Sequence, residues 1–252
     1  MASKRYPALH AYLTHSAPEY HRILRPVEVR ASLLAWYADN RRRLPWRGDA
    51  PPYNGSTAGT NKKAPAAAAA AAAKAAAASR TFAGPPARAV SAYGTWVSEI
   101  MCQQTRVEAV IPYWLAWMEA FPTVHELAAA SEEEGSARWA GPGLYRRARS
   151  LHEGAKQVIA EMDGQLPTTV DGLLRIQGIG PYTAGAIASI SAGVAAPAVD
   201  GNVLRVFSRL CAVTTDVKDP AYVKLATGLA RHLVEADGAA RPGELNQALM
   251  EV

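Results

Sequence analysis

Apolar residues recur at the spacing of an α-helix along most of the chain, and no stretch of β-branched residues alternates as a strand would. Thr123 is followed three residues later by Glu126, which is typical of a helix-capping box, and Ser131 with the three glutamates after it is expected to begin the next helix. The pattern predicts an all-α fold of about ten helices. The helical period is clearest over residues 30–40, 93–101, 110–121, 151–162, 203–210 and 222–235, and a last helix is expected to begin at Glu244.

Two prolines are expected to mark helix starts, where their missing N–H is tolerated. Pro112 is expected in the first turn of the helix over 110–121, and Pro181 at the start of a helix that runs through Ile190. Gly178-Ile179-Gly180 directly precedes Pro181, and two glycines around one apolar residue allow a sharp turn and a close backbone approach. The free N–H groups of such a helix start favour a phosphate, although a Gly-x-Gly between helices is more often only a turn.

The length of 252 residues allows one large domain or two small lobes. Residues 1–25 lack a clear period and are expected to form a flexible arm ahead of a helical domain over residues 26–252. Residues 54–91 contain an alanine tract, broken by Lys74 and flanked by proline and glycine, with no apolar stripe that could dock it. We therefore expect a low-complexity surface insertion within the domain, mostly disordered.

The net charge of +5 does not by itself indicate which kind of partner the protein binds. The basic excess is concentrated in residues 1–64, which allows an anionic partner, but a solvated basic end would explain it equally well. Residues 1–18 carry two cations and no acidic residue, so a weak organelle-targeting signal is conceivable. No membrane partner is expected, because the alanine tract is too weakly hydrophobic to span a bilayer.

The two cysteines, Cys102 and Cys211, cannot build a disulfide framework or a four-cysteine metal site. Buried free thiols in a reducing compartment are the expected state of both. No metal site is therefore expected in this chain.

Two carboxylates stand out. Glu99 lies within the apolar run over 93–101, with almost no cation nearby before Arg106, so desolvation would favour its neutral form. The alternative is a glutamate on the solvent side of an ordinary helix. Asp200 follows the helix that starts at Pro181 by about ten residues, at an apolar-to-turn junction.

Three further segments carry side chains suited to nucleic acid, each with a plainer alternative. The amides of Gln103 and Gln104, ahead of Thr105, can reach base edges or be surface residues. Trp46 and Arg47 follow a proline and either contact a base or phosphate or form an exposed loop with Trp46 in the core. The tip formed by Leu144 and Tyr145, backed by Arg147, could wedge into a duplex or simply begin a helix with solvated arginines.

Five blocks of the sequence resemble, in order, the MutY family of adenine DNA glycosylases, within the helix-hairpin-helix DNA glycosylase superfamily. The blocks are LLAWYADNRRRLPWR, WVSEIMCQQTRVEAVIPY, WAGPGLYRRARSLHEGA, IQGIGPYTAGAIASI and VDGNVLRV, and the segments RPVEVRASLLAWY and ARPGELNQALME most resemble eukaryotic members. The likeness covers about residues 25–252 apart from the insertion. It implies two helical lobes with the active-site cleft between them.

The resemblance also implies residue roles. The catalytic residues would be Glu99, Asp200, Tyr182 and Asn202. The residues that contact the substrate or the DNA would be Trp46, Arg47, Gln103, Gln104, Thr105, Leu144, Tyr145, Arg147, Gly178, Ile179, Gly180 and Gln247.

The chemistry agrees with these roles, because cleaving an N-glycosidic bond needs a protonated leaving base and a stabilised sugar cation. A neutral Glu99 could give a proton to adenine, at N7 in this family, and an ionised Asp200 could stabilise the sugar, once the nucleotide is flipped out of the stack. Tyr182 stands where endonuclease III-like members carry a lysine that forms a Schiff base, so we expect a monofunctional enzyme that leaves an abasic site.

Two departures from the family pattern matter. The family usually has Leu-Gly-Tyr-Tyr where this chain has Pro142-Gly143-Leu144-Tyr145, so an intercalating tyrosine becomes Leu144, which stacks less well. The family also continues into four cysteines that bind a 4Fe–4S cluster and into a domain that reads 8-oxoguanine. We read this chain as a fragment, and we expect the cluster in the full-length protein.

The implied partner is double-stranded DNA with adenine opposite 8-oxoguanine or guanine. The protein would act as a monomer in the nucleus, with the mitochondrion as a second compartment and replication or repair proteins as further partners. The alternatives are a thymine or uracil mismatch glycosylase of the same fold, and a catalytically inactive helix-hairpin-helix DNA-binding module.

Overall fold

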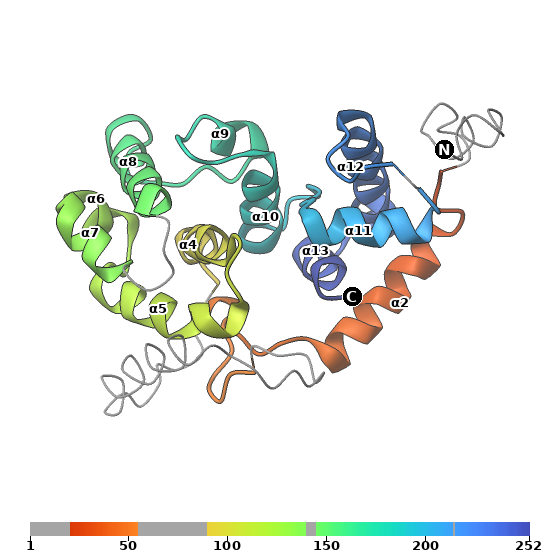
Figure 1. Ribbon diagram of the computed structural model, residues 1–252, viewed down its shortest axis with the longest axis horizontal. Helices are drawn as coiled ribbons and strands as arrows, with labels where there is room; N and C mark the ends of the chain where they lie inside the picture. Colours follow the sequence, from red (N-terminus) through yellow and green to blue (C-terminus); the bar gives the residue numbers. More distant parts are fainter. Residues whose placement is uncertain (1–20, 55–89, 140–144, 214) are drawn as a thin grey trace, which may run out of the picture. The chain divides into compact units, whose positions relative to one another are not determined.

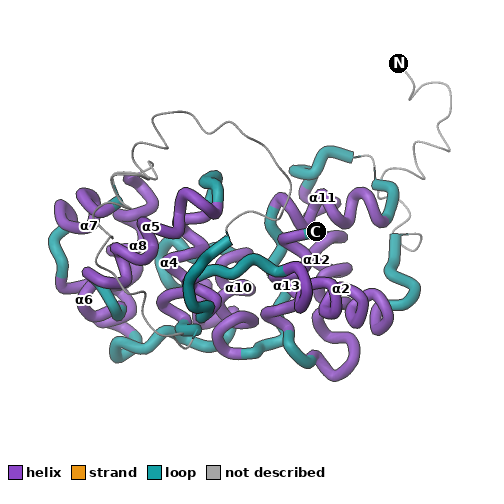
Figure 2. Tube along the Cα trace, turned by 90° about the horizontal axis from the view of Figure 1, so that it is seen from below, coloured by secondary structure: helices purple, strands orange, loops and turns teal. Residues whose placement is uncertain are grey.

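The computed structural model describes residues 21–54, 90–139, 145–213 and 215–252, and all regular secondary structure in these ranges is helical (Figures 1 and 2). The prediction of an all-α fold is confirmed. Most of the expected insertion over 54–91, namely 55–89, and most of the expected arm over 1–25 lie outside the described residues. At the end of that arm, His21 is buried, with its Nδ1 3.1 Å from the carbonyl oxygen of Cys211.

The chain forms two compact units, of which unit 1 combines both ends, Met1–Arg41 and Ala188–Val252, and unit 2 is the middle, Arg42–Ile187. Helix α10 (Pro181–Ala192) begins in unit 2 and ends in unit 1. Unit 2 also holds η3 (Pro45–Arg47), α4 (Ala92–Cys102), α5 (Val107–Ala120), α6 (Val124–Ala129), α7 (Glu132–Arg138), α8 (Tyr145–Glu161) and α9 (Val170–Leu174). Unit 1 holds α2 (Pro26–Asn40), α11 (Gly201–Leu210), α12 (Pro220–Glu235), η4 (Ala236–Ala239) and α13 (Pro242–Glu251).

In unit 2, the long helix α8 packs against α4, α6 and α7 (Figure 1). Its apolar side is buried at Leu151, Ala155 and Val158, which follow the helical period. Around it, aromatic residues fill the core: Trp117 lies edge-on to Trp139 with ring centroids 5.3 Å apart. Because fully buried indoles remove large apolar areas from water, these contacts contribute much of the stability of unit 2.

In unit 1, α2 packs against α12 and α13. Apolar residues of α11, α12 and α13 form the core, with Phe207, Leu233 and Leu245 completely buried. Arg30 of α2 is also buried, and its guanidinium donates to the carbonyl oxygens of Leu233 (3.1 Å) and Val234 (3.2 Å). These carbonyls belong to the last turn of α12, where no helical N–H follows to pair with them, so Arg30 caps that helix from another part of the chain.

Local signals placed most helix starts correctly. Thr123 and Ser131 cap α6 and α7 in complete capping boxes with Glu126 and Glu134, so the predicted box at Thr123 and the predicted helix start at Ser131 are confirmed. The placement of Pro112 in a first turn was wrong, because α5 begins at Val107 and puts the proline in the helix interior.

The reason lies in packing. A proline inside a helix removes one backbone hydrogen bond. Here the apolar side of α5 extends toward its N-terminus, and Val110 and Trp114 are buried on it, which favours a continuous helix.

None of the described helices combines the length and hydrophobicity that a membrane span requires.

Candidate active site

Glu99 and Tyr182 meet in unit 2. Glu99 lies half-buried in the last turn of α4, and Tyr182 is the second residue of α10. The Tyr182 hydroxyl donates a hydrogen bond to Glu99 Oε2 over 2.5 Å, although the two residues are 83 positions apart in the chain. A donor at this distance fixes the position of the carboxyl group.

Glu99 lies beside buried apolar residues of its own helix. Its helix neighbours Trp96 and Ile100 are buried, as the sequence pattern predicted. Cys102 follows one turn later, and burial raises the pKa of its thiol, with the charge of Glu99 acting in the same direction and the charges of Arg47 and Arg42 opposing it. Cys102 is therefore a protonated thiol, unsuited to nucleophilic or metal chemistry.

Trp46 and Arg47 form a short 3-10 turn instead of an open loop. Leu44 enters the turn with extended backbone (φ −133°, ψ 140°), as expected ahead of a proline, and is buried with Pro45. The half-buried Trp46 ring lies 6.0 Å from the ring of Trp114 on α5, measured between centroids. Arg47 donates to the carbonyl oxygen of Arg42 over 3.1 Å, so the turn is fixed at both side chains.

The segment after α4 is a tight turn held by α8. Gln104 has a left-handed backbone (φ 56°), which is uncommon for a residue other than glycine. Arg147 of α8 donates to the Gln103 carbonyl oxygen and, over 3.4 Å, to Gln104 Oε1. Thr105 Oγ1 also donates to the Gln103 carbonyl oxygen, over 3.3 Å. The turn thus places the exposed Gln104 side chain at its tip.

The Gly178-Ile179-Gly180 segment is a sharp turn, as its glycines predicted. Gly178 has φ +84°, and a Cβ atom there would lie 2.1 Å from the Ser150 Oγ, so only glycine fits. Ile179 is buried, whereas Gly180 is exposed with no heavy atom within 4 Å of the position a Cβ would take. The backbone ahead of α10 is therefore accessible to a partner.

Asp200 is the N-cap of α11 in unit 1. Its Oδ1 accepts hydrogen bonds from the backbone N–H groups of Asn202 and Val203, each over 2.9 Å. The Asn202 side chain donates to Oδ2 over 2.7 Å, and Arg205 in turn donates to Asn202 Oδ1. These contacts orient both carboxylate oxygens. Since Glu99 belongs to unit 2, a cleft shared by the two carboxylates stays a prediction.

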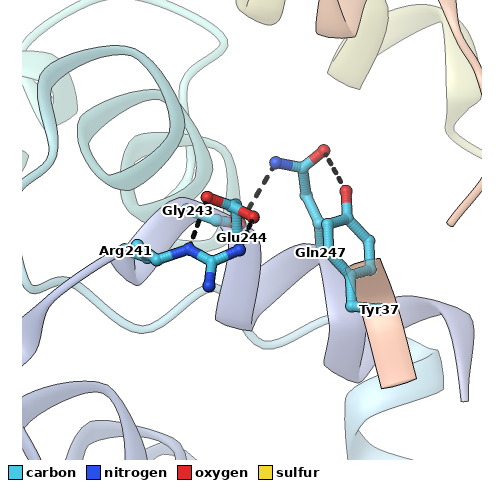
Figure 3. A network of polar contacts seen from close by, with 5 residues as sticks. All are labelled: Tyr37, Arg241, Gly243, Glu244 and Gln247. Carbon is cyan, nitrogen blue, oxygen red and sulfur yellow. Dashed lines mark hydrogen bonds and ion pairs between the residues drawn. The ribbon is translucent and has the colours of Figure 1, made fainter. Parts of the chain in front are cut away.

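Gln247 is buried on α13, where unit 1 already occupies both ends of its amide (Figure 3). Its Oε1 accepts from the Tyr37 hydroxyl over 3.1 Å, and its Nε2 donates to the Gly243 carbonyl oxygen over 3.2 Å. Arg241 and Glu244 form an ion pair on the same helix (Figure 3). The amide is therefore held in one orientation, which suits either a structural role or the presentation of an edge to a base.

Of the remaining expected residues, Tyr145 is exposed at the start of α8, and Leu144 lies outside the described residues. Among the residues that the structure places, no three His, Cys, Asp or Glu side chains gather as metal ligands would. A 4Fe–4S cluster takes four thiolates, and the chain holds two cysteines, one in each unit. The residues of this chain do not fit such a cluster.

No sequence pattern indicated Gln157, a polar residue of α8 that contacts the segment before Gly178. Its Oε1 accepts from the Gln177 N–H over 2.8 Å, and its Nε2 donates to the Arg175 carbonyl oxygen over 3.0 Å. A glutamine on a helix face is usually solvated, and only the packing of the two segments shows these contacts.

Comparison with known proteins gives a consistent result. Residues 97–231 match the family described as "HhH-GPD superfamily base excision DNA repair protein". The chain is 39% identical over 244 residues to an adenine DNA glycosylase of Homo sapiens, covering 95% of this chain and 38% of that protein. It is 38% identical over 244 residues to one of Arabidopsis thaliana, covering 89% and 33%. The chain thus spans well under half the length of these relatives.

Two solved structures have a similar fold. A thermostable thymine-DNA glycosylase aligns with a TM-score of 0.64 at 20% identity, covering 90% of this chain and 84% of that one. An endonuclease III in a non-covalent DNA complex aligns with a TM-score of 0.54 at 21% identity, covering 73% and 84%. At this identity the likeness shows the fold alone.

Proposed function

Because the chain belongs to the HhH-GPD superfamily of base excision DNA repair proteins, we propose that it is the catalytic part of an adenine DNA glycosylase. The substrate is adenine opposite 8-oxoguanine or guanine in double-stranded DNA. The observation that carries the proposal is the hydrogen bond to Glu99 from Tyr182, two residues after Gly180, which fixes a carboxyl group that lies beside buried apolar residues of α4.

Glu99 acts as the acid. Losing adenine from the sugar requires a proton on the leaving base, and a carboxyl group in apolar surroundings is suited to give one. Tyr182 holds that carboxyl group in position through Oε2. The flipped adenine then receives the proton on its ring nitrogen as the glycosidic bond breaks.

The Asp200 carboxylate stabilises the positive charge that develops on the sugar, or bonds to it transiently. Its two oxygens are oriented by the first turn of α11 and by Asn202, so little reorganisation is needed when the charge develops. Both carboxyl groups must reach the same nucleotide, and this is a requirement of the proposal.

The position of Tyr182 limits the reaction to base removal. A phenol cannot form a Schiff base with the sugar aldehyde, whereas a lysine amine can. Water therefore completes the reaction, and the product is an intact strand with an abasic site.

DNA contacts come from two exposed turns of unit 2. Gln104 extends an amide from a turn clamped by Arg147, and Gly180 presents accessible backbone at the start of α10. Backbone N–H groups at a helix start suit a phosphate of the strand. The 4Fe–4S cluster, a nuclear or mitochondrial location and contacts with replication or repair proteins belong to the full-length protein in this proposal.

A single-turnover assay on the full-length protein tests the function. The duplex carries labelled adenine opposite 8-oxoguanine, and strand cleavage is read with and without hot alkali. We expect product only after alkali, and a rate lower by about 100-fold or more in Glu99→Gln, because general acid catalysis contributes about that much. The matched control is Glu119→Gln, the same exchange at an exposed glutamate of α5.

Other outcomes would redirect the proposal. Cutting without alkali would mean a lyase, against the role given to Tyr182. Release of thymine or uracil from duplexes mismatched with guanine, and none of adenine, would make the chain a different mismatch glycosylase. Binding with no base released from any of these duplexes would leave a DNA-binding module.

A further inference from the structure

One face of α8 supports both exposed turns of unit 2. Arg147, Ser150, Gly154 and Gln157 are spaced three or four residues apart, which places them on one side of a helix. Arg147 clamps the turn that carries Gln104. The other three residues contact the segment that leads into Gly178-Ile179-Gly180.

The contact begins with close backbone approach. Gly154 lets the segment lie directly against α8, because a Cβ there would be 2.8 Å from the Gln177 carbonyl oxygen. Ser150 is also close to this segment, because a Cβ atom at Gly178 would lie 2.1 Å from the Ser150 Oγ. The two glycines thus allow the segments to pack closely. The backbone N–H and C=O groups at this contact then need hydrogen-bond partners.

Gln157 pairs that backbone on both sides of Ile176. Its amide accepts from the Gln177 N–H and donates to the Arg175 carbonyl oxygen, at 2.8 and 3.0 Å. Glu161, one turn further along α8, accepts a second hydrogen bond from Nε2 over 2.9 Å and so fixes the orientation of the amide. A side-chain amide used in this way replaces a missing secondary-structure partner.

The turn is held from inside by the buried side chains of Ile176 and Ile179 and by a hydrogen bond from the Ile179 N–H to the Ile176 carbonyl oxygen, over 3.1 Å. Two hollows are lined in part by Gln177 and Gly178. One, of about 140 Å³, is lined by Trp96, Gln103 and Arg147. The other is an open groove of about 710 Å³ along Lys156, Gln157 and Arg175. The hydrogen bonds of Gln157 add a restraint on the exposed side of this segment, at Arg175 and Gln177.

We propose that Gln157 is a positioning residue for DNA binding. It holds Arg175–Gln177 against α8, and so keeps the N–H groups of Gly178 and Gly180 directed at a phosphate of the DNA strand, while the Ile179 N–H donates to the Ile176 carbonyl oxygen within the turn. The role rests on the proposed function, in which this turn meets the DNA backbone. Gln157 itself makes no contact with the reacting atoms.

The test compares Gln157→Met, which keeps the shape of the side chain and removes its hydrogen bonds to Arg175 and Gln177, with Gln157→Glu. The second change is made together with Glu161→Gln, so that it keeps the acceptor for the Gln177 N–H without placing two carboxylates side by side. Gln165→Met is the matched control, the same exchange at an exposed glutamine beyond α8. The dissociation constant is measured on the full-length protein with a duplex that carries a non-hydrolysable 2′-fluoroadenosine opposite 8-oxoguanine. The single-turnover rate at saturating DNA and the hydrogen exchange of the Gln177 amide are measured in parallel.

We expect Gln157→Met to weaken binding about tenfold, the effect of one or two hydrogen bonds, with the saturating rate unchanged. The Gln177 amide should exchange faster in this variant and stay protected in Gln157→Glu, whose affinity should fall in between. Unchanged affinity and amide protection in Gln157→Met would overturn the proposal. The proposal would also be overturned if the two variants lowered the melting temperature to the same extent and the saturating rate to the same extent, because Gln157 would then act in folding. A wild-type protein that does not bind the duplex would instead refute the proposed function.

Discussion

The Glu99 carboxyl group and the Tyr182 hydroxyl come from helices far apart in the chain, and one hydrogen bond joins them. That bond restrains the side chain proposed to move the proton, and it makes no contact that DNA binding needs. Loss of the hydroxyl should therefore affect the chemical step more than affinity.

Tyr182→Phe removes this hydroxyl and leaves the ring. We expect the single-turnover rate on adenine opposite 8-oxoguanine to fall about tenfold or more, because Glu99 becomes a carboxylate as it gives up its proton, and a hydrogen bond to a charged group contributes about 1.5–3 kcal/mol. The dissociation constant for the duplex should not change. Tyr113→Phe, at a half-buried tyrosine of α5, is the control. A variant as fast as wild type would remove Tyr182 from the mechanism.

Gly154→Ala should change the free energy of unfolding in two opposite ways, through helix propensity and through a steric clash. Alanine gains about 1 kcal/mol of helix propensity over glycine. At this position the new Cβ would lie 2.8 Å from the Gln177 carbonyl oxygen and from the Trp96 ring, so the gain should be lost to displacement of the turn, at about 1–3 kcal/mol. Urea unfolding should show a lower midpoint. Gly228→Ala in α12, where no atom lies within 4 Å of the Cβ position, should instead raise the urea midpoint. Equal shifts of the midpoint in the two variants would show that the turn moves away from the new Cβ at no cost.

Among the helices, α11 combines a structural and a chemical feature at its first turn. Asp200 caps the helix and is also the carboxylate proposed to stabilise the sugar. The two roles need different properties of the side chain. A cap needs only an acceptor oxygen, whereas the sugar cation needs a negative charge.

Asp200→Asn and Asp200→Ala separate these roles. Asparagine caps as well as aspartate, so Asp200→Asn should unfold within a few tenths of a kcal/mol of wild type and lose most base-removal activity, whereas Asp200→Ala should also lose about 1 kcal/mol of stability. Urea unfolding and the single-turnover assay measure the two effects. Near wild-type activity in Asp200→Asn would contradict the role of the charge.

α6 and α7 show how far local signals reach. Their capping boxes involve residues three positions apart, and the sequence predicted the box at Thr123 and the helix start at Ser131. The C-terminal end of α12, in contrast, is capped by Arg30, about 200 positions away. No pattern near α12 indicates this contact, because the carbonyl acceptors at a helix end are present in every sequence.

Taking the chain as a whole, unit 1 is built from both ends of the sequence and unit 2 from its middle. Contacts such as Tyr37 with Gln247 join residues 210 positions apart. Forming unit 1 thus requires closing a loop that contains all of unit 2, at an entropic cost that grows slowly with loop length.

Stability of the whole chain should fall in acid. A side-chain hydrogen bond from Thr123 lowers the pKa of Glu126, the backbone N–H of Ser131 lowers that of Glu134, and Arg241 lowers that of Glu244. A carboxyl group with a lowered folded-state pKa stabilises the fold above its unfolded-state pKa of about 4.3. This contribution is lost as the pH falls through the lower folded-state value. The urea midpoint should therefore be lower at pH 3.5 than at pH 6.

A variant with glutamine at all three positions should show a smaller difference between these two pH values, because glutamine keeps a hydrogen-bonding oxygen without a proton to bind. Equal differences in the variant and in wild type would mean that other carboxyl groups dominate the acid response.

The sequence by itself determined the helical class, most helix starts, the capping boxes and the glycine turn before α10. It also indicated Glu99, Tyr182 and Asp200 as candidate residues through their resemblance to a family. These features depend on neighbours within about four positions or on matched motifs, and both can be read along a chain.

Only the tertiary structure decided that Tyr182 reaches Glu99, that Arg147 and Gln157 hold two turns from one face of α8, and that Arg30 caps α12. It also decided that Pro112 lies inside α5. Each of these outcomes depends on which surfaces pack together and at what distance. Hydrogen-bond partners that are remote in sequence leave no periodic or local signal, because a polar side chain on a helix face looks the same whether water or a distant backbone group satisfies it.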